Sequence, residues 1–303
     1  MLRNVLIRIL RAYFLLVLTM ALFPSSMMAQ LRKNCPDGIA MKVSTRSAVQ
    51  GSLVLTEVLA PKTVSGLSSE WDGRSISLWH EPEETGLHGL IGVDLEKAPG
   101  QYEWKISWPG REGDAQSCGM VISVRGGKFV TERLKVEKQF VQPDPEQQKR
   151  AEEDSKKMQA IYDHVTPERL WEGKFRLPLK VISTGGNFGR RRILNGEARS
   201  PHAGVDFPAK AGTAVYSSQA GKVALAENLY YSGNTVVIDH GYGIYTMYAH
   251  LSEIGVQEGD KVEAWEEIGK VGATGRVTGP HLHWGLTINH ARVNAMQISQ
   301  VQP

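Results

Sequence analysis

Two short stretches in the C-terminal half of the chain contain residue types that bind catalytic metal ions. His202-Ala203-Gly204-Val205-Asp206 lies well upstream of His281-Leu282-His283. Two imidazoles and one carboxylate form a ligand set of catalytic zinc sites, in which the fourth position is left to water. Zinc lowers the pKa of such a water to about 7 and makes it a nucleophile. These residues therefore predict a hydrolytic zinc site, to which either histidine of the second stretch could contribute.

The local sequence indicates that both stretches lie on strands and loops. Gly204 and the nearby Pro208 disfavour a helix, so the first stretch is expected on a loop that runs into a strand. No HExxH motif occurs, which separates the chain from peptidases with a helical zinc motif. On a strand, His281 and His283 would point to the same face, about 6.5 to 7 Å apart. One of them can then bind the metal while the other stands beside the substrate.

The elements that must position these residues belong to a compact antiparallel β domain, expected at residues 174–303. Short apolar segments alternate there with glycine-rich turns, which is typical of hairpin-connected strands. Strands are expected at residues 214–216, 222–226, 235–239, 244–249, 267–271 and 283–288. The candidate site would thus be built from one β unit with long loops.

A second β region precedes it, and the fold class is therefore mostly β. Residues 30–141 are expected to form a β-sandwich-like accessory domain, because short alternating segments are separated by Gly, Pro, Asp and Ser. The clearest alternation, at residues 102–108, puts four large side chains on one face. Other strands are expected at residues 53–55, 76–79 and 120–124.

Cys35 and Cys118 are the two cysteines of the chain, and both lie in this accessory region. The N-terminal sequence described below predicts export, and exported proteins fold in an oxidising compartment. We therefore expect a disulfide between them; the alternative is a pair of free buried thiols. A cysteine-ligated metal is not expected, because neither cysteine is near the histidines.

A helical connector is expected at residues 142–173. Asp144 can cap the helix, Pro145 suits its first position, and an apolar stripe follows at Met158, Ile161 and Val165. Residues 166–171 are expected to form a second short helical turn. The many charges of this stretch indicate a solvated helix face.

Residues 1–29 resemble a signal peptide, with early arginines, an apolar run at residues 12–23 and a small-residue cleavage zone. Export to the periplasm or the medium follows. Contact with the membrane is expected only transiently, through this segment, unless the segment stays uncleaved and tethers the protein. The net charge of +3 is too small to indicate a nucleic-acid partner, and none is expected. A composition of 41% hydrophobic and 22% charged residues is that of an ordinary globular protein.

Three motifs in order resemble the lysostaphin-like (LytM-type) zinc metallopeptidases. They are His202-Ala203-Gly204-Val205-Asp206, Tyr248-Ala249-His250-Leu251 and Thr278-Gly279-Pro280-His281-Leu282-His283-Trp284. The resemblance extends from about residue 178 to residue 293. It implies an antiparallel β peptidase domain that binds one Zn²⁺ and cuts the peptide cross-links of peptidoglycan.

The resemblance also implies a role for each residue of the motifs. His202, Asp206 and His283 would hold the metal, and His250 and His281 would be catalytic histidines that do not bind it. One of the latter two can take a proton while the other stabilises the oxyanion. Which of them is the base stays open.

Three further residues are candidates for substrate contacts. Asn187 and Arg190 belong to a stretch, Asn187-Phe188-Gly189-Arg190-Arg191-Arg192, that is similar to a groove-lining segment of the family. Its arginines could receive carboxylates of an acidic peptide polymer, or form a solvent-facing turn. Tyr248, two residues before His250, would share its strand face, with a role in the core as the alternative.

Two other functions are compatible with the sequence. One is a regulator of cell-wall amidases, or a wall-binding module, that does not cut. The other is a metallopeptidase acting on glycine-rich proteins. The first domain could position the catalytic domain, bind the wall or cover the groove. The remaining histidines are expected to be structural or solvated: His80, His88, His164, His240 and His290.

Overall fold

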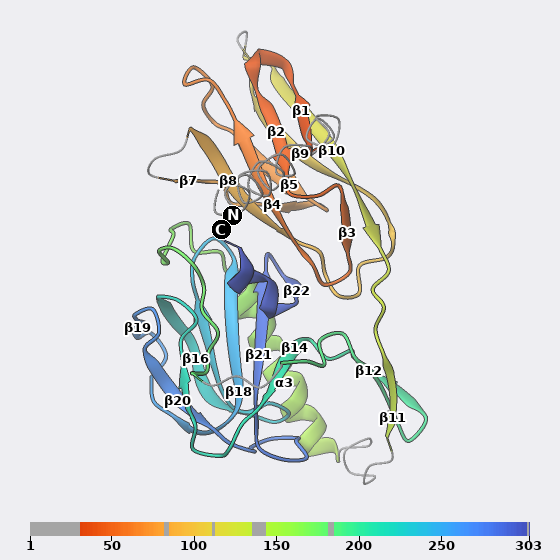
Figure 1. Ribbon diagram of the computed structural model, residues 1–303, viewed down its shortest axis with the longest axis vertical. Helices are drawn as coiled ribbons and strands as arrows, with labels where there is room; N and C mark the ends of the chain where they lie inside the picture. The colour runs from red at the N-terminus through yellow and green to blue at the C-terminus, as the bar shows by residue number, and fades with distance from the viewer. Residues whose placement is uncertain (1–30, 82–84, 111–112, 135–143, 181–184, 302) are drawn as a thin grey trace, which may run out of the picture.

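The computed structural model describes residues 31–81, 85–110, 113–134, 144–180, 185–301 and 303 (Figure 1). The expected signal peptide lies outside the described residues. Within the described ranges, no helix is long and apolar enough to cross a membrane. The chain is mostly β, as the sequence predicts, with antiparallel sheets and one α-helix in the described part.

Two five-stranded sheets share one core in the N-terminal half. The first sheet has the order β1 (Arg32–Asn34), β2 (Ala40–Val43), β4 (Leu53–Leu59), β8 (Gly86–Gly92) and β7 (Trp79–His80). The second has the order β3 (Ser47–Val49), β10 (Ala115–Arg125), β9 (Gly100–Pro109), β5 (Ser68–Trp71) and β6 (Arg74–Ser75). Alternate residues of β9, including Trp104 and Ile106, are fully buried between the sheets.

The disulfide between Cys35 and Cys118 confirms the expected pairing. Cys35 follows β1 and precedes the short 3-10 helix η1 (Pro36–Gly38), whereas Cys118 lies within β10. Because β1 and β10 belong to different sheets, the bond joins the two layers of this region.

The strand expected at residues 76–79 is wrong over most of its length. β6 ends at Ser75 and β7 begins at Trp79, so residues 76–78 pair with no strand. The physical reason is that β6 and β7 belong to different sheets, and the chain crosses between them here. Ile76 and Trp79 are both buried, but in two separate cores. The apolar pattern of residues 76–79 therefore records burial, and only Trp79 belongs to a strand, in which it pairs with His88.

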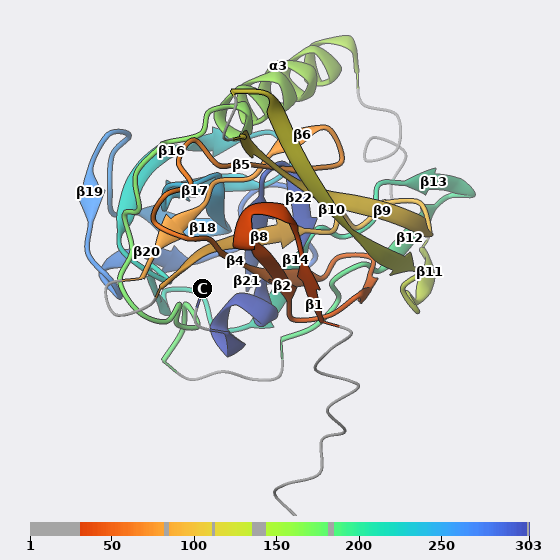
Figure 2. The same cartoon turned by 90° about the horizontal axis from the view of Figure 1, so that it is seen from above.

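The connector contains one helix, α3 (Pro145–Asp163), which begins as predicted. The Asp144 side chain accepts a hydrogen bond from the Gln147 N–H, and the Gln147 side chain accepts one from the Asp144 N–H. Met158, Ile161 and Tyr162 pack against β16 (Gly221–Leu229), β17 (Gly233–Asp239) and β18 (Ile244–Ile254). Figure 2 shows α3 at the periphery of the molecule.

The second helical turn, expected at residues 166–171, does not form. Its backbone groups are used elsewhere: Leu170 N–H donates to the carbonyl of His240, and Thr166 C=O accepts from Tyr242 N–H. The segment is therefore held as an extended stretch against the loop between β17 and β18.

A nine-stranded antiparallel sheet forms the C-terminal half. Its main path is β14 (Gly204–Pro208), β21 (His281–Ile288), β18, β17, β16 and β19 (Lys261–Val262). Three strands lie off this path: β15 (Ala214–Tyr216), β20 (Glu267–Val271) and β22 (Ala291–Val293), followed by the 3-10 helix η3 (Ala295–Gln300). A small sheet of β11 (Thr131–Leu134), β12 (Arg191–Leu194) and β13 (Glu197–Arg199) lies beside it, with β11 and β12 parallel.

The two halves of the chain share a contact that is partly apolar and partly ionic (Figure 1). Trp79 packs in the same core as the nine-stranded sheet and stacks on Tyr242, with ring centroids 5.7 Å apart. Arg292 of β22 donates to Asp94, 2.7 Å away, and to Glu96, 2.8 Å away. The N-terminal half is thus docked on the β21–β22 side of the sheet.

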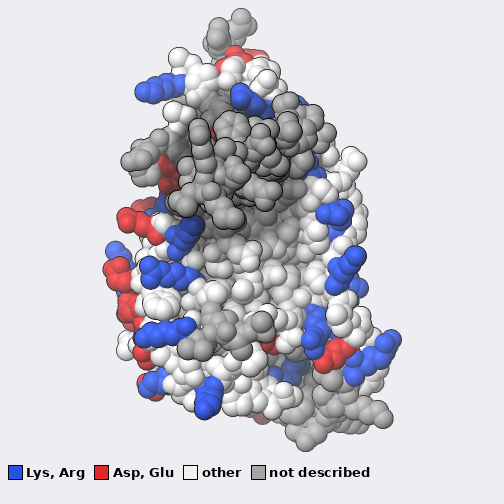
Figure 3. All heavy atoms as spheres, viewed as in Figure 1, with Lys and Arg blue, Asp and Glu red and all other residues white. Residues whose placement is uncertain are grey.

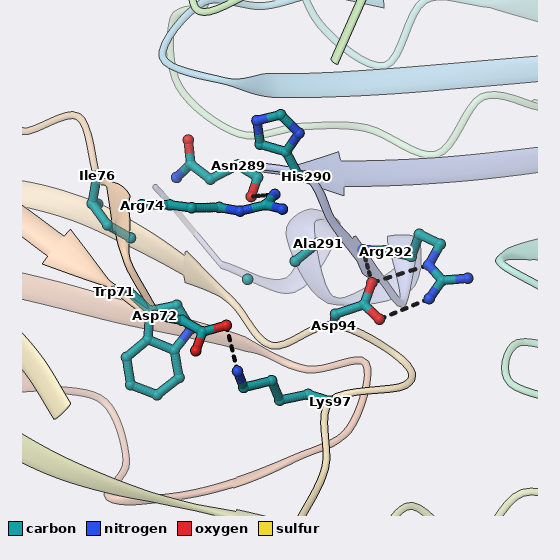
Figure 4. A pocket seen from close by; sticks show the side chains of 11 residues that line it. Trp71, Asp72, Arg74, Ile76, Asp94, Lys97, Asn289, His290, Ala291 and Arg292 are labelled. Atoms are coloured by element: carbon teal, nitrogen blue, oxygen red, sulfur yellow. Dashed lines mark hydrogen bonds and ion pairs between the residues drawn. The ribbon is translucent and has the colours of Figure 1, made fainter. Parts of the chain in front are cut away.

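A cavity of about 290 Å³ lies in this contact, between the β5–β6 turn and the β21–β22 turn (Figure 4). Four of its charged lining residues form ion pairs, Lys97 with Asp72 and Arg292 with Asp94, and a fifth, Arg74, donates to the Asn289 carbonyl. On the face shown in Figure 3, charged side chains of both signs lie along the edges and uncharged atoms occupy much of the middle.

Candidate metal and catalytic site

Three side chains bring their ligand atoms to one point. His202 Nε2 and Asp206 Oδ1 lie 3.0 Å apart, His283 Nδ1 lies 3.0 Å from His202 Nε2, and it lies 3.1 Å from Asp206 Oδ1. Zinc binds nitrogen and oxygen ligands at about 2.0 to 2.2 Å, so atoms this close together can all reach a single ion. The donor set of two imidazoles and a carboxylate fits Zn²⁺ with further positions open.

Strand register accounts for this convergence. Asp206 on β14 pairs directly with His283 on β21, and directly paired residues have neighbouring side chains. His202 lies just before β14 and reaches the same point from the preceding loop. Gly204 makes room for the metal ligand, because a Cβ atom there would lie 2.5 Å from His283 Nε2. The glycine in the first motif is therefore needed for packing at the site.

A backbone carbonyl orients the His202 ring. His202 Nδ1 lies 3.1 Å from the Asn187 carbonyl oxygen, which can only accept, so Nδ1 carries the proton and Nε2 is left for the metal. The Asn187 side-chain amide also donates to Asp206 Oδ2, at 3.3 Å. Asn187, expected to contact the substrate, thus lies at the site and contacts two residues of the candidate metal cluster, His202 and Asp206.

Asp206 is held in its ionised form. Burial acts to raise its pKa, but the hydrogen bonds and charges of His202 and His283 act more strongly, and the pKa lies far below its ordinary value. An ionised carboxylate is the form that binds metal ions.

His250 and His281 lie next to the ligand cluster. Their ring centroids are 4.8 Å apart, and His281 Nε2 is 3.7 Å from Asp206 Oδ1. His250 Nδ1 donates to the Thr274 carbonyl and His281 Nδ1 to the Gly279 carbonyl, each at 2.9 Å. Because both Nδ1 atoms carry protons, Nε2 is the nitrogen of each ring that can accept one.

Burial lowers the pKa of His250 to about 4, and the nearby His283 acts in the same direction. His250 is therefore neutral at neutral pH, with an unprotonated Nε2. A neutral imidazole at a reaction centre is suited to proton abstraction. Thr274 and Gly279, which fix the two tautomers, were not singled out by sequence reasoning.

A β-bulge turns His250 toward the site. Tyr248 pairs with Val236 and Leu251 pairs with Asn234, so Ala249 and His250 together face one residue of β17. His250 has φ +63°, a left-handed conformation that β-bulges accommodate. The alternation of side chains along β18 is therefore interrupted just before His250.

Because of this bulge, Tyr248 does not share a face with His250, and the expected substrate contact is wrong for this geometry. Tyr248 is fully buried. Its hydroxyl accepts from Ser218 N–H at 2.7 Å and donates to Ser218 Oγ at 2.9 Å. The side chain takes the alternative role, in the core.

Arg190 lies beside the site loop and is paired with an acidic residue. Its Nη1 atom is 3.2 Å from Glu132 Oε1, and about one third of each side chain is exposed, 34% and 31%. Glu132 belongs to β11, which joins the N-terminal half to the connector. Sequence reasoning missed Glu132, because no local motif marks it.

The chain matches peptidase family M23 over residues 200–295, a range that contains all five of these histidine and aspartate residues. This region therefore belongs to peptidase family M23. Within the M23 region, the motif residues that suggested a LytM-type peptidase are the ones that the fold brings together.

Two curated relatives carry names that describe an activity. The peptidoglycan DD-endopeptidase ShyA of Vibrio cholerae is 48% identical over 112 residues, which are 37% of this chain and 26% of ShyA. The DD-carboxypeptidase/endopeptidase Mpg of Neisseria meningitidis is 42% identical over 138 residues, covering 41% of this chain and 32% of Mpg. The chain thus spans about a quarter to a third of the length of these relatives.

A solved structure resembles nearly the whole chain. A Pseudomonas aeruginosa protein described as an M23 peptidase is 27% identical, with a TM-score of 0.60, and the match covers 90% of this chain and 97% of that one. The combination of an N-terminal β region with an M23 region is therefore shared with another protein.

Proposed function

We propose that the protein is an exported, zinc-dependent metalloendopeptidase that hydrolyses peptide cross-links of peptidoglycan. The observation that carries the proposal is the convergence of His202 Nε2, Asp206 Oδ1 and His283 Nδ1 within 3.1 Å of one another. The name of ShyA supports peptidoglycan as the substrate class, and the names of both ShyA and Mpg support endopeptidase activity. Peptidoglycan lies outside the cytoplasmic membrane, so export through the signal-like N-terminus agrees with this substrate.

His202, Asp206 and His283 would hold the zinc ion. When bound, Zn²⁺ supplies Lewis-acid chemistry, lowering the pKa of water and polarising a peptide carbonyl. Other residues of the chain orient these three side chains. The Asn187 carbonyl keeps the His202 ring in its ligating tautomer, and the register of β14 and β21 keeps Asp206 beside His283.

His250 and His281 would handle protons. Each ring has Nδ1 fixed as a donor to a backbone carbonyl, so proton exchange with the reacting groups takes place at Nε2. The neutral form of His250 suits it to remove the proton of the attacking water. His281 Nε2, on the Asp206 side of the site, can donate a hydrogen bond to the oxyanion once the ring is protonated.

The test is digestion of purified sacculi, with mass analysis of the released fragments. Zinc-loaded protein should release cross-link peptides, and a chelator should abolish the release. The Asp206→Ala variant should release none. Release of nothing by the zinc-loaded wild type would favour a regulator that does not cut. Digestion of glycine-rich soluble proteins without release from sacculi would favour the protein metallopeptidase.

A further inference from the structure

The turn at residues 186–190 contacts two of the proposed metal ligands, His202 and Asp206. Gly186 and Asp206 exchange two backbone hydrogen bonds, of 3.2 and 2.9 Å. Gly189 N–H donates to the His202 carbonyl at 2.8 Å, and His202 N–H donates to the Arg190 carbonyl at 3.0 Å. Together with the Asn187 contacts, these bonds make the position of His202 depend on the shape of this turn.

The same turn is packed against the N-terminal half of the chain. The Phe188 ring lies over Gly51, where an added Cβ atom would be 2.7 Å from Phe188 Cζ. It also meets Phe129 edge to face, with ring centroids 6.3 Å apart and planes at 73°. Phe129 in turn covers Gly189, where a Cβ atom would lie 2.9 Å from Phe129 Cγ. Phe188 and Gly189 are thus packed against residues of the N-terminal half and of its exit segment, the stretch at residues 129–134 through which the chain leaves that half.

The exit segment then continues alongside the turn. Arg191 N–H donates to the Val130 carbonyl at 2.9 Å, and β11 runs parallel to β12 from Thr131 and Arg191 onward. The Glu132–Arg190 ion pair lies across this junction. The surface behind Phe188 is itself fixed, because the Gln50 side chain donates to the Lys97 carbonyl at 2.8 Å and accepts from Gly127 N–H at 3.0 Å.

We propose that the N-terminal domain and its exit strand β11 act as a scaffold for the zinc site, and that Phe188 is the positioning residue through which they act. Phe188 touches neither metal nor substrate in this role. It fixes the 186–190 turn, and the turn fixes the His202 ring through the Asn187 carbonyl and the Gly189 and Arg190 backbone. The inference rests on the proposed zinc site.

The test compares the zinc affinity of full-length variants by competition with a chromogenic chelator. Phe188→Ala should weaken zinc binding by about tenfold or more, the range typical of residues that orient metal ligands. Phe188→Leu, which keeps an apolar side chain against Gly51, should recover much of the affinity. Glu132→Gln should weaken zinc binding by a smaller factor, because it removes only the ion pair across the junction.

Two matched controls separate positioning from general destabilisation. Tyr162→Ala also removes one ring of an edge-to-face pair, with Tyr245 at 5.4 Å and 72°, but on the α3 side of the sheet. Glu57→Gln removes an ion pair with Lys42 of similar exposure inside the N-terminal domain. Both should bind zinc like the wild type.

The outcomes are distinguishable. If the wild type binds zinc and Phe188→Ala binds it as tightly as Tyr162→Ala does, the scaffold proposal is wrong while the proposed function stands. If the wild type does not bind zinc, the proposed function and the scaffold proposal fail together.

Discussion

Asp206 and His283 occupy directly opposite positions on β14 and β21, and their Oδ1 and Nδ1 atoms lie 3.1 Å apart. A shift of register by one residue would turn every side chain of one strand to the other face of the sheet. Two of the proposed metal ligands, far apart in sequence, are therefore brought together by backbone pairing. The His283 ring lies against the partner strand at Gly204, where a side chain would collide with it.

Gly204→Ala should weaken zinc binding by about tenfold or more, because the new methyl group would displace the His283 ring. Chelator competition measures the change. Gly100→Ala is the control: it lies at the start of β9, outside the site, and its added Cβ atom would meet Tyr102 Cε2 at 3.5 Å, an ordinary van der Waals contact. Equal zinc affinity in the two variants would contradict the role assigned to Gly204.

The Cys35–Cys118 disulfide should make a large contribution to stability. It closes a loop with a sequence separation of 83 residues, and the chain-entropy model then gives about 4 to 5 kcal/mol. The Cys35→Ser, Cys118→Ser double variant should therefore unfold at a clearly lower temperature in a calorimeter. A reductant should lower the transition of the wild type and leave that of the variant unchanged. Identical transitions would show that the bond restrains little in the unfolded chain.

His240 should make stability depend on pH. Burial lowers its pKa to about 4, while its hydrogen bond to the Ala220 carbonyl acts in the opposite direction. The unfolded chain has the ordinary pKa of 6.5 and binds the proton more readily, so the stability from neutral His240 is full above pH 6.5 and is lost as the pH falls toward 4. Between pH 7 and pH 5 the loss should be about 2 kcal/mol.

Urea unfolding of the wild type and of His240→Gln at pH 7 and pH 5 isolates this loss, because glutamine does not titrate whereas His250, whose pKa is also lowered to about 4, contributes to both proteins. The relevant neighbours are uncharged at these pH values: His240 contacts Thr246 and the Phe175 ring, and the Tyr248 hydroxyl is bonded to Thr246. An unchanged pH dependence in the variant would mean that another group carries the effect.

The site could be predicted from sequence where it depends on motif order, and not where it depends on backbone irregularity. The ligand atoms of His202, Asp206 and His283 meet as the motifs imply. The side-chain alternation expected for Tyr248 fails, because a bulge with a left-handed residue leaves no signature in the identities of its neighbours. The expected alternation of side chains assumes regular strand pairing, and β18 departs from regular pairing at His250.

The fold, too, could be predicted where it depends on local sequence, and could not where it depends on contacts between distant segments. α3 begins at Pro145 after an Asp144 cap, both readable in the sequence. Residues 166–171 have a plausible helix start, but their backbone groups bond to the loop that contains His240 and Tyr242. Glu132 and Phe129 could not be linked to the site either, because both reach it through tertiary contacts. Glu132 does so through the pairing of β11 with β12, and Phe129 through its packing on Phe188 and Gly189.

The most direct test of the account is a comparison of His283→Ala and His281→Ala for both bound zinc and release of cross-link peptides from purified sacculi. The account predicts that His283→Ala loses zinc and activity together. It predicts that His281→Ala retains zinc at the level of the wild type and loses turnover, by about a hundredfold or more, as expected for removal of an acid–base group. Full peptide release by His281→Ala with zinc bound would contradict the account.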